Sequence, residues 1–111
     1  MSETIEGRCM LYNFDFLKYR DRRTEGMDCP APKCFHLQGV CWKSRFPAIV
    51  KVFVNGQEKA RVLAGESADA YPLPNSELIA HGAIIRIEVI SIRRRWFRRN
   101  TTRVTLEGLE Q

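Results

Sequence analysis

The sequence predicts an all-β fold, a single small antiparallel β-sandwich or barrel-like domain with an irregular cysteine-containing loop in its first half. Three observations support this prediction. β-Branched and aromatic residues alternate with polar ones along several short segments. An Asn-Gly pair, typical of a tight hairpin turn, follows one of these segments. No stretch keeps a helical period, and 111 residues with 44% hydrophobic content are enough for one domain, residues 1–111, with its own core.

The first half of the chain contains one clear strand pattern. Residues 1–8 are expected to be a flexible N-terminus, and residues 10–19 (MLYNFDFLKY) alternate in the manner of a strand. Residues 20–26 (RDRRTEG) form a polar turn or loop in this prediction. Two prolines in residues 27–34 (MDCPAPKC) predict irregular structure. Residues 35–43 (FHLQGVCWK) predict two short strands about Gln38-Gly39.

A β-hairpin is the clearest sequence pattern in the second half of the chain. Residues 49–54 (IVKVFV) place Val50, Val52 and Val54 on one face, and residues 58–64 (EKARVLA) form the partner strand with its small apolar residues inward. Asn55-Gly56 joins the two strands, because both residues tolerate the positive φ of a type I′ turn.

The remaining segments predict a meander of short antiparallel strands. Residues 68–74 (ADAYPLP) are at best an edge strand, because their prolines cannot donate ladder hydrogen bonds. Residues 74–78 could open a helical turn. The strongest strand is 83–92 (AIIRIEVISI), and we expect its partner to be 102–107 (TRVTLE), which makes residues 93–101 a basic hairpin loop.

One part of the second half has a recognisable order of strands and turns. The run VFVNGQEKARVLAGESADAYPLP, followed by GAIIRIEV, resembles the strand–Asn-Gly–strand–turn order of small bacterial β-sandwich modules such as PEGA-type domains. The resemblance spans residues 50–90 and leaves out the cysteine-containing half. It carries no functional residue over to this chain.

The candidate binding site is the segment RRRWFRRN at residues 93–100. The chain has 18 basic and 13 acidic residues; without the five arginines of this segment, 13 of each remain, so the whole excess charge lies here. Arginine binds phosphate and carboxylate in a bidentate manner, and the two aromatics offer flat faces. The candidate residues are Arg93, Arg94, Arg95, Trp96, Phe97, Arg98 and Arg99, and Arg20, Arg22 and Arg23 could extend the patch.

Three interpretations of this segment stay open. Arg and Trp are enriched at protein-binding hot spots, so the segment could dock on an acidic protein surface or a nucleoprotein assembly. It could instead bind nucleic acid directly with weak sequence specificity, by phosphate contacts and base stacking. It could also be a solvated tip whose charges prevent edge-to-edge aggregation. We expect the first, with nucleic-acid binding as the alternative.

The cysteines raise the question of a metal. Cys29, Cys34, His36 and Cys41 form the pattern C-x4-C-x-H-x4-C, which offers four ligands of the types that a structural zinc ion prefers. Reduced thiols and disulfides that include Cys9 are the other interpretations. Structural zinc is therefore a possible cofactor, and none is certain.

The sequence contains no complete catalytic motif. It lacks a phosphate-binding loop, a dinucleotide fingerprint, a zinc-protease helix and a nucleophile elbow. The N-terminus lacks the features of a secretory signal, and no apolar run has the length of a membrane span. We therefore expect a soluble intracellular, cytoplasmic protein that is not an enzyme and acts as an adaptor, inhibitor or accessory factor.

Overall fold

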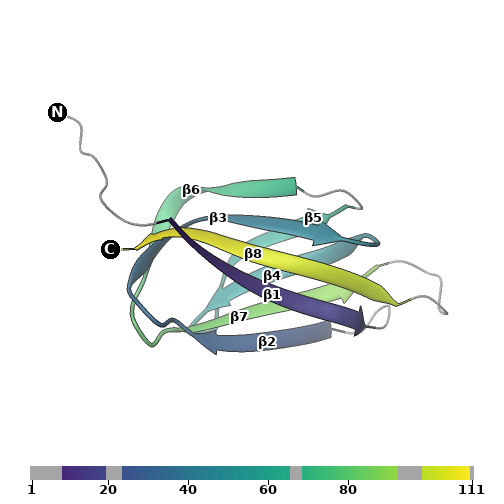
Figure 1. Cartoon of the computed structure of the whole chain (residues 1–111), viewed down its shortest axis with the longest axis horizontal. Helices are drawn as coiled ribbons and strands as arrows, with labels where there is room; N and C mark the ends of the chain where they lie inside the picture. The colour runs from purple at the N-terminus through teal and green to yellow at the C-terminus, as the bar shows by residue number, and fades with distance from the viewer. Residues whose placement is uncertain (1–8, 20–23, 66–68, 93–98, 111) are drawn as a thin grey trace.

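The protein is built from β-strands alone in the part of the chain that the structure describes. This computed structural model describes residues 9–19, 24–65, 69–92 and 99–110, in which strands and their connections leave no helix (Figure 1). The all-β prediction is confirmed. The strands are β1 (Cys9–Tyr19), β2 (Thr24–Pro30), β3 (Phe35–Ser44), β4 (Ala48–Val54), β5 (Gln57–Ala64), β6 (Asp69–Ile79), β7 (Ile84–Ser91) and β8 (Asn100–Glu110).

The strands form two antiparallel sheets. The first sheet has the order β1-β8-β3-β6, and the second has the order β2-β7-β4-β5. Figure 1 shows the two sheets as layers that face each other along the length of the molecule. Each sheet ends in two edge strands, so the fold is a sandwich and not a closed barrel, which the sequence pattern alone left open.

The expected meander is wrong in its pairing. Only β4 and β5 are both neighbours in the chain and partners in a sheet. Strand β7 pairs with β2 and β4, whereas β8 pairs with β1 and β3, so the connection between β7 and β8 crosses from one sheet to the other. The strands that flank the basic hairpin predicted at residues 93–101 therefore do not pair with each other, and residues 93–98 themselves lie outside the described residues. Alternation fixes the buried face of each strand but leaves its partner unspecified.

Three local predictions also need correction. Residues 27–30 belong to β2, because a strand at the sheet edge that ends in Pro30 tolerates a residue without an N–H. Residues 35–43 form one strand, and the register shift between Leu37 and Gly39 absorbs the break expected there. Residues 74–78 continue β6 and form no helical turn.

The core lies between the two sheets and matches the predicted faces. Val50, Val52 and Val54 are buried, and so are the alternate residues of β7 and β8. The hairpin at Asn55-Gly56 is confirmed, with φ angles of 49° and 84°. The other core residues predicted by alternation and found buried are Phe14, Phe16, Ala60, Ala64, Ile85, Ile87, Val89, Val104 and Leu106.

Candidate functional site

The predicted basic site falls largely outside the described residues. This applies to Arg93, Arg94, Arg95, Trp96, Phe97 and Arg98, and also to Arg20, Arg22 and Arg23. Of the predicted binding residues, Arg99 is described, and its side chain is exposed just before β8. What the structure does define is where the two arginine-rich segments begin and end.

Both segments start and finish at one end of the sandwich. Segment 20–23 leaves β1 at Tyr19 and enters β2 at Thr24, and segment 93–98 lies between β7 and β8. Tyr19 is the cross-strand partner of Asn100, and Thr24 is the partner of Ile90. The chain ends that carry the two segments are therefore adjacent in both sheets. We call this end of the molecule the basic end.

A buried asparagine connects the sheets at the basic end. The Asn100 side chain is 0% exposed. Its Oδ1 accepts hydrogen bonds from the backbone N–H groups of Phe46 (2.9 Å) and Thr101 (2.8 Å). Its Nδ2 donates to the carbonyl oxygen of Phe46 (3.0 Å) and to Ser91 Oγ at the end of β7 (3.2 Å). Because β7 and β8 belong to different sheets, this one side chain fixes the distance between them.

Three further buried polar side chains extend this network. Thr102 Oγ1 lies 2.8 Å from Ser44 Oγ and 2.6 Å from the hydroxyl of Tyr19, which joins the ends of β8, β3 and β1. The turn between β3 and β4 is tied in by two backbone bonds, from Arg45 N to Thr101 O (2.8 Å) and from Ile92 N to Pro47 O (3.1 Å). The strand ends that carry the basic segments are thus held in one polar frame.

Sequence reasoning missed this role of Asn100. It treated Asn100 as the residue that closes the basic segment RRRWFRRN, whereas the residue is buried at the start of β8. A signal was present in the alternation, because Asn100 and Thr102 occupy the same inward-facing alternate positions as Val104 and Leu106. Polar residues at inward positions require hydrogen-bond partners, and these partners come from elements that the sequence did not place together.

The structure adds other cations to the basic end. Lys43 and Arg103 are cross-strand partners on the outer face of the first sheet. The Arg45 guanidinium lies 5.1 Å from the centre of the Phe46 ring, a cation–π distance. Arg103 pairs with Asp15 (2.6 Å), but within the described residues neither Lys43 nor Arg45 has an ion-pair partner. These two exposed cations are available to an anion.

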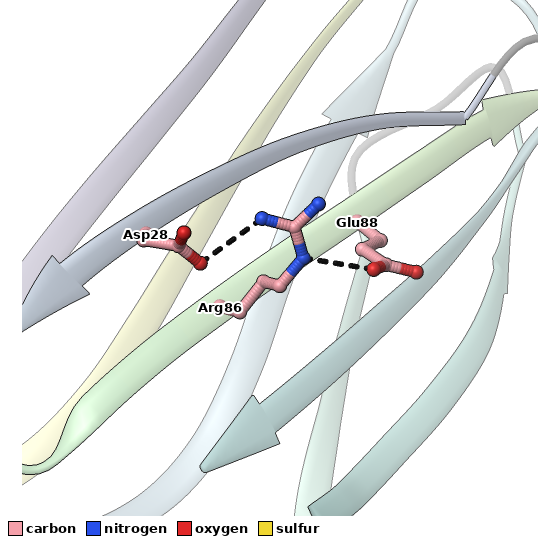
Figure 2. Close-up of polar contacts among 3 residues, drawn as sticks. All are labelled: Asp28, Arg86 and Glu88. Atoms are coloured by element: carbon pink, nitrogen blue, oxygen red, sulfur yellow. Dashed lines mark hydrogen bonds and ion pairs between the residues drawn. The ribbon is translucent and has the colours of Figure 1, made fainter. Parts of the chain in front are cut away.

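The second sheet carries a charged row of a different kind. The Arg86 guanidinium donates to Glu88 (2.8 Å) on its own strand and to Asp28 (3.0 Å) on β2, as Figure 2 shows. These hydrogen bonds raise the pKa of Arg86. The guanidinium occupies the space that a Cβ at Gly26 would take, so a larger residue there would require the flexible end of Arg86 to shift. Arg86 is committed to internal partners and does not offer an anion site.

The four predicted zinc ligands are not brought together. Cys29 lies on β2 in the second sheet, while His36 and Cys41 lie five residues apart on β3, roughly 15 Å along a strand. Zinc ligands approach the metal to about 2.0–2.3 Å. Cys34 Sγ instead accepts a hydrogen bond from the backbone N–H of His81 (3.4 Å). Among the described residues, no group of three or more His, Cys, Asp or Glu side chains could hold a metal ion.

The thiol of Cys41 is held in its protonated form. Its Sγ donates to Glu107 Oε2 (3.1 Å) on the outer face of the first sheet. Burial, together with the hydrogen bond to and the negative charge of Glu107, raises the pKa of Cys41 to about 11. A nucleophilic cysteine needs the opposite shift. In the described part of the chain, no hydrogen bond joins a thiol to an imidazole.

Comparisons with known proteins assign no family to this chain. No family model and no curated protein matches it. Among solved structures it is similar to the CBM36-1 domain of a multidomain xylanase from the hindgut metagenome of Trinervitermes trinervoides, with a TM-score of 0.45, 12% identity and coverage of 92% of this chain and 94% of that one. It is also similar to an exo-β-1,3-galactanase from Phanerochaete chrysosporium, with a TM-score of 0.41, 12% identity and coverage of 91% and 27%.

A third solved structure is a family two carbohydrate esterase from Cellvibrio japonicus, with a TM-score of 0.38, 13% identity and coverage of 94% of this chain and 36% of that one. All three likenesses are too distant to assign a ligand or an activity. A separate finding concerns membranes: none of the described segments forms a helix long and apolar enough to cross one.

Proposed function

We propose that this protein is a small non-enzymatic binding module, an adaptor, inhibitor or accessory factor, that docks through its basic end on an acidic protein surface or nucleoprotein assembly. The observation that carries the proposal is the pairing of Tyr19 with Asn100 and of Thr24 with Ile90. Because of these pairs, the strand ends that flank the two arginine-rich segments of the sequence lie side by side. Eight arginines therefore belong to two neighbouring connections.

The frame beneath these segments favours binding. Asn100, Thr102 and Ser44 hold the strand ends by buried hydrogen bonds, which reduces the entropy lost when a partner binds. Lys43 and Arg45 add positive charge beside the same end, and this charge has no ion-pair partner among the described residues. An anionic partner would meet a continuous positive field there.

A protein partner is favoured over nucleic acid by the described surface. Stacking of bases needs exposed aromatic faces among the cations, but Trp42 and Phe46 near this end are buried. Two apolar side chains are exposed beside the basic end, Leu17 near the end of β1 (69% accessible) and Ile92 directly after β7 (43% accessible). Carboxylates and aliphatic contacts on a protein surface complement this combination. Direct nucleic-acid binding through Trp96 and Phe97 remains the second candidate.

The test is affinity capture from nuclease-treated extract, followed by binding measurements with the purified partner. We expect Arg94→Ala/Arg98→Ala and Trp96→Ala to lose the partner. The matched control is Lys33→Ala/Arg61→Ala, which removes the same charge away from the basic end and should bind normally. Binding that is unchanged in all three variants would refute the proposal.

Oligonucleotide titrations separate the two candidates. A protein-docking module should bind single- and double-stranded oligonucleotides negligibly at about 0.15 M salt. Nucleic-acid binding would instead show an affinity that falls steeply with salt, with a log–log slope of about −0.7 to −0.9 for each phosphate contacted. A steep slope that Arg94→Ala/Arg98→Ala reduces would establish the second candidate in place of the first.

A further inference from the structure

The four edge strands of the sandwich differ in how well they are protected against pairing with another chain. Edge strands expose unpaired backbone groups, and proteins normally protect them with prolines, charges or irregularities. Strand β6 contains Pro72 and Pro74 and a register shift opposite Leu37 and Gly39. Strand β2 is short, and it ends at Pro30.

Strand β5 is protected by charge. Its Lys59 forms an ion pair with Glu77 of β6 (3.0 Å), which spans from one sheet to the other. Its Arg61 pairs with Glu58 (2.9 Å) on the same strand. An incoming strand at this edge would have to disturb these charged side chains.

Strand β1 has fewer of these features: its charged residues are Asp15, which pairs with Arg103, and Lys18, which lies at its one irregularity. It is 11 residues long and contains no proline. Its register against β8 is unbroken from Cys9↔Leu109 to Phe16↔Thr102 and shifts only before Tyr19, where Lys18 has a φ of 53°. Within the described residues, no strand pairs with its outer edge. Alternate backbone N–H and C=O groups of β1 therefore point away from β8.

Two polar side chains on the outer face of β1, Asn13 and Asp15, already have partners. On the outer face, Asp15 is paired with Arg103 (2.6 Å), and Asn13 accepts a hydrogen bond from Thr105 (2.6 Å). On the inner face, Phe14 and Phe16 are buried in the core. In the middle of β1, polar Asn13 and Asp15 on the outer face alternate with Phe14 and Phe16 on the inner face, which specifies the face that a partner strand must match.

We propose that this edge is a self-association site, at which β1 pairs antiparallel with β1 of a second copy of the chain. The two four-stranded sheets then join into one eight-stranded sheet. Residues that lie opposite each other on the two β1 strands must point to the same side of the joined sheet. The two-fold axis therefore passes through a residue position and not between two residues. An axis at Asn13 pairs position 9 with position 17 and keeps the whole contact within β1, on one side of the irregularity at Lys18.

A second copy fits this edge because its own β1 presents the same open edge and the same inner and outer faces. The axis at Asn13 places Phe14 opposite Tyr12 of the second copy, so inner side chains meet inner side chains. It places Asp15 opposite position 11 of the second copy and not opposite a second Asp15, so no like charges face each other. The contact includes position 17, beside the basic end, but it uses neither arginine-rich segment, so the inference does not depend on the proposed function.

The experiment is sedimentation of the full chain over a concentration range of about 1–500 μM, which covers weak interfaces. We expect a monomer–dimer equilibrium. Asn13→Lys places two like charges opposite each other at the axis and should raise the dimer dissociation constant by about fivefold or more. The matched control is Thr105→Lys, which adds the same charge and loses the same hydrogen bond, but on a central strand. It should leave the constant within about twofold.

Hydrogen exchange of the unmodified chain gives a second readout that does not depend on a variant that folds. Amides on the outer edge of β1 should be protected more strongly at high than at low concentration, while amides of β6 should not change. A chain that stays monomeric over the whole range would overturn the inference. So would a dimer in which both lysine variants weaken association equally, or in which the protected amides lie on another strand.

Discussion

Replacement of Asn100 by alanine tests whether the buried polar frame holds the two sheets together at the basic end. The substitution removes five hydrogen bonds of 2.8–3.4 Å, with Phe46 N, Phe46 O, Thr101 N, Ser91 Oγ and Ser44 Oγ. Each is worth about 1 kcal/mol net, and a buried group that loses its partner costs about 1–3 kcal/mol. We expect the free energy of unfolding to fall by roughly 3–4 kcal/mol, a large part of the 5–15 kcal/mol typical of small domains.

Urea denaturation measures this loss as a lower midpoint at an unchanged slope. The matched control is Asn13→Ala on β1, because Asn13 is exposed and has a single hydrogen bond, to Thr105. It should cost less than about 1 kcal/mol. If Asn100→Ala costs no more than Asn13→Ala, the buried network does not stabilise the junction of the sheets, and the preorganised frame assumed for the basic end is refuted.

Two further predictions concern packing and thiol chemistry. In Gly108→Ala the new Cβ would lie 2.5 Å from the ring of buried Phe35. We therefore expect the free energy of unfolding to fall by about 1–3 kcal/mol in the same urea assay. Gly65→Ala, where no atom lies within 4 Å of the new Cβ, should change it little. Iodoacetamide near pH 8 should alkylate exposed Cys34 well before Cys41, whose pKa is raised to about 11, and peptide mass spectrometry would reveal the order. Equal alkylation rates would contradict the hydrogen-bonded thiol, and Cys41 should become reactive only as the pH approaches 11.

Local alternation predicted the strands and their buried faces well. Val50, Val52 and Val54 lie in the core as expected, because a period of two fixes which side chains point inward without any knowledge of the partner strand. The turn at Asn55-Gly56 was equally predictable, since both residues adopt the positive φ that their chemistry allows.

The pairing of strands could not be predicted in the same way. Residues 83–92 and 102–107 look like two arms of one hairpin, but they belong to different sheets. The reason is that each inner face buries its side chains against the opposite sheet, and this contact is equally available to strands far apart in sequence. The proposed zinc ligands fail for the same reason, because their spacing of four residues assumed a compact loop where Cys29 and Cys41 lie in strands of different sheets.

The two proposals have a joint geometric consequence, because β1 takes part in both. Its outer edge would pair with a second copy about Asn13, and its last residue, Tyr19, opens the first arginine-rich segment. Six residues at about 3.3 Å each place Tyr19 roughly 20 Å from the two-fold axis, so the two basic ends of a dimer lie roughly 40 Å apart and point in opposite directions. Two basic ends placed in this way cannot contact one small acidic patch at the same time. A dimer would instead bridge two anionic partners, and avidity would appear only with a partner that presents acidic sites at that spacing.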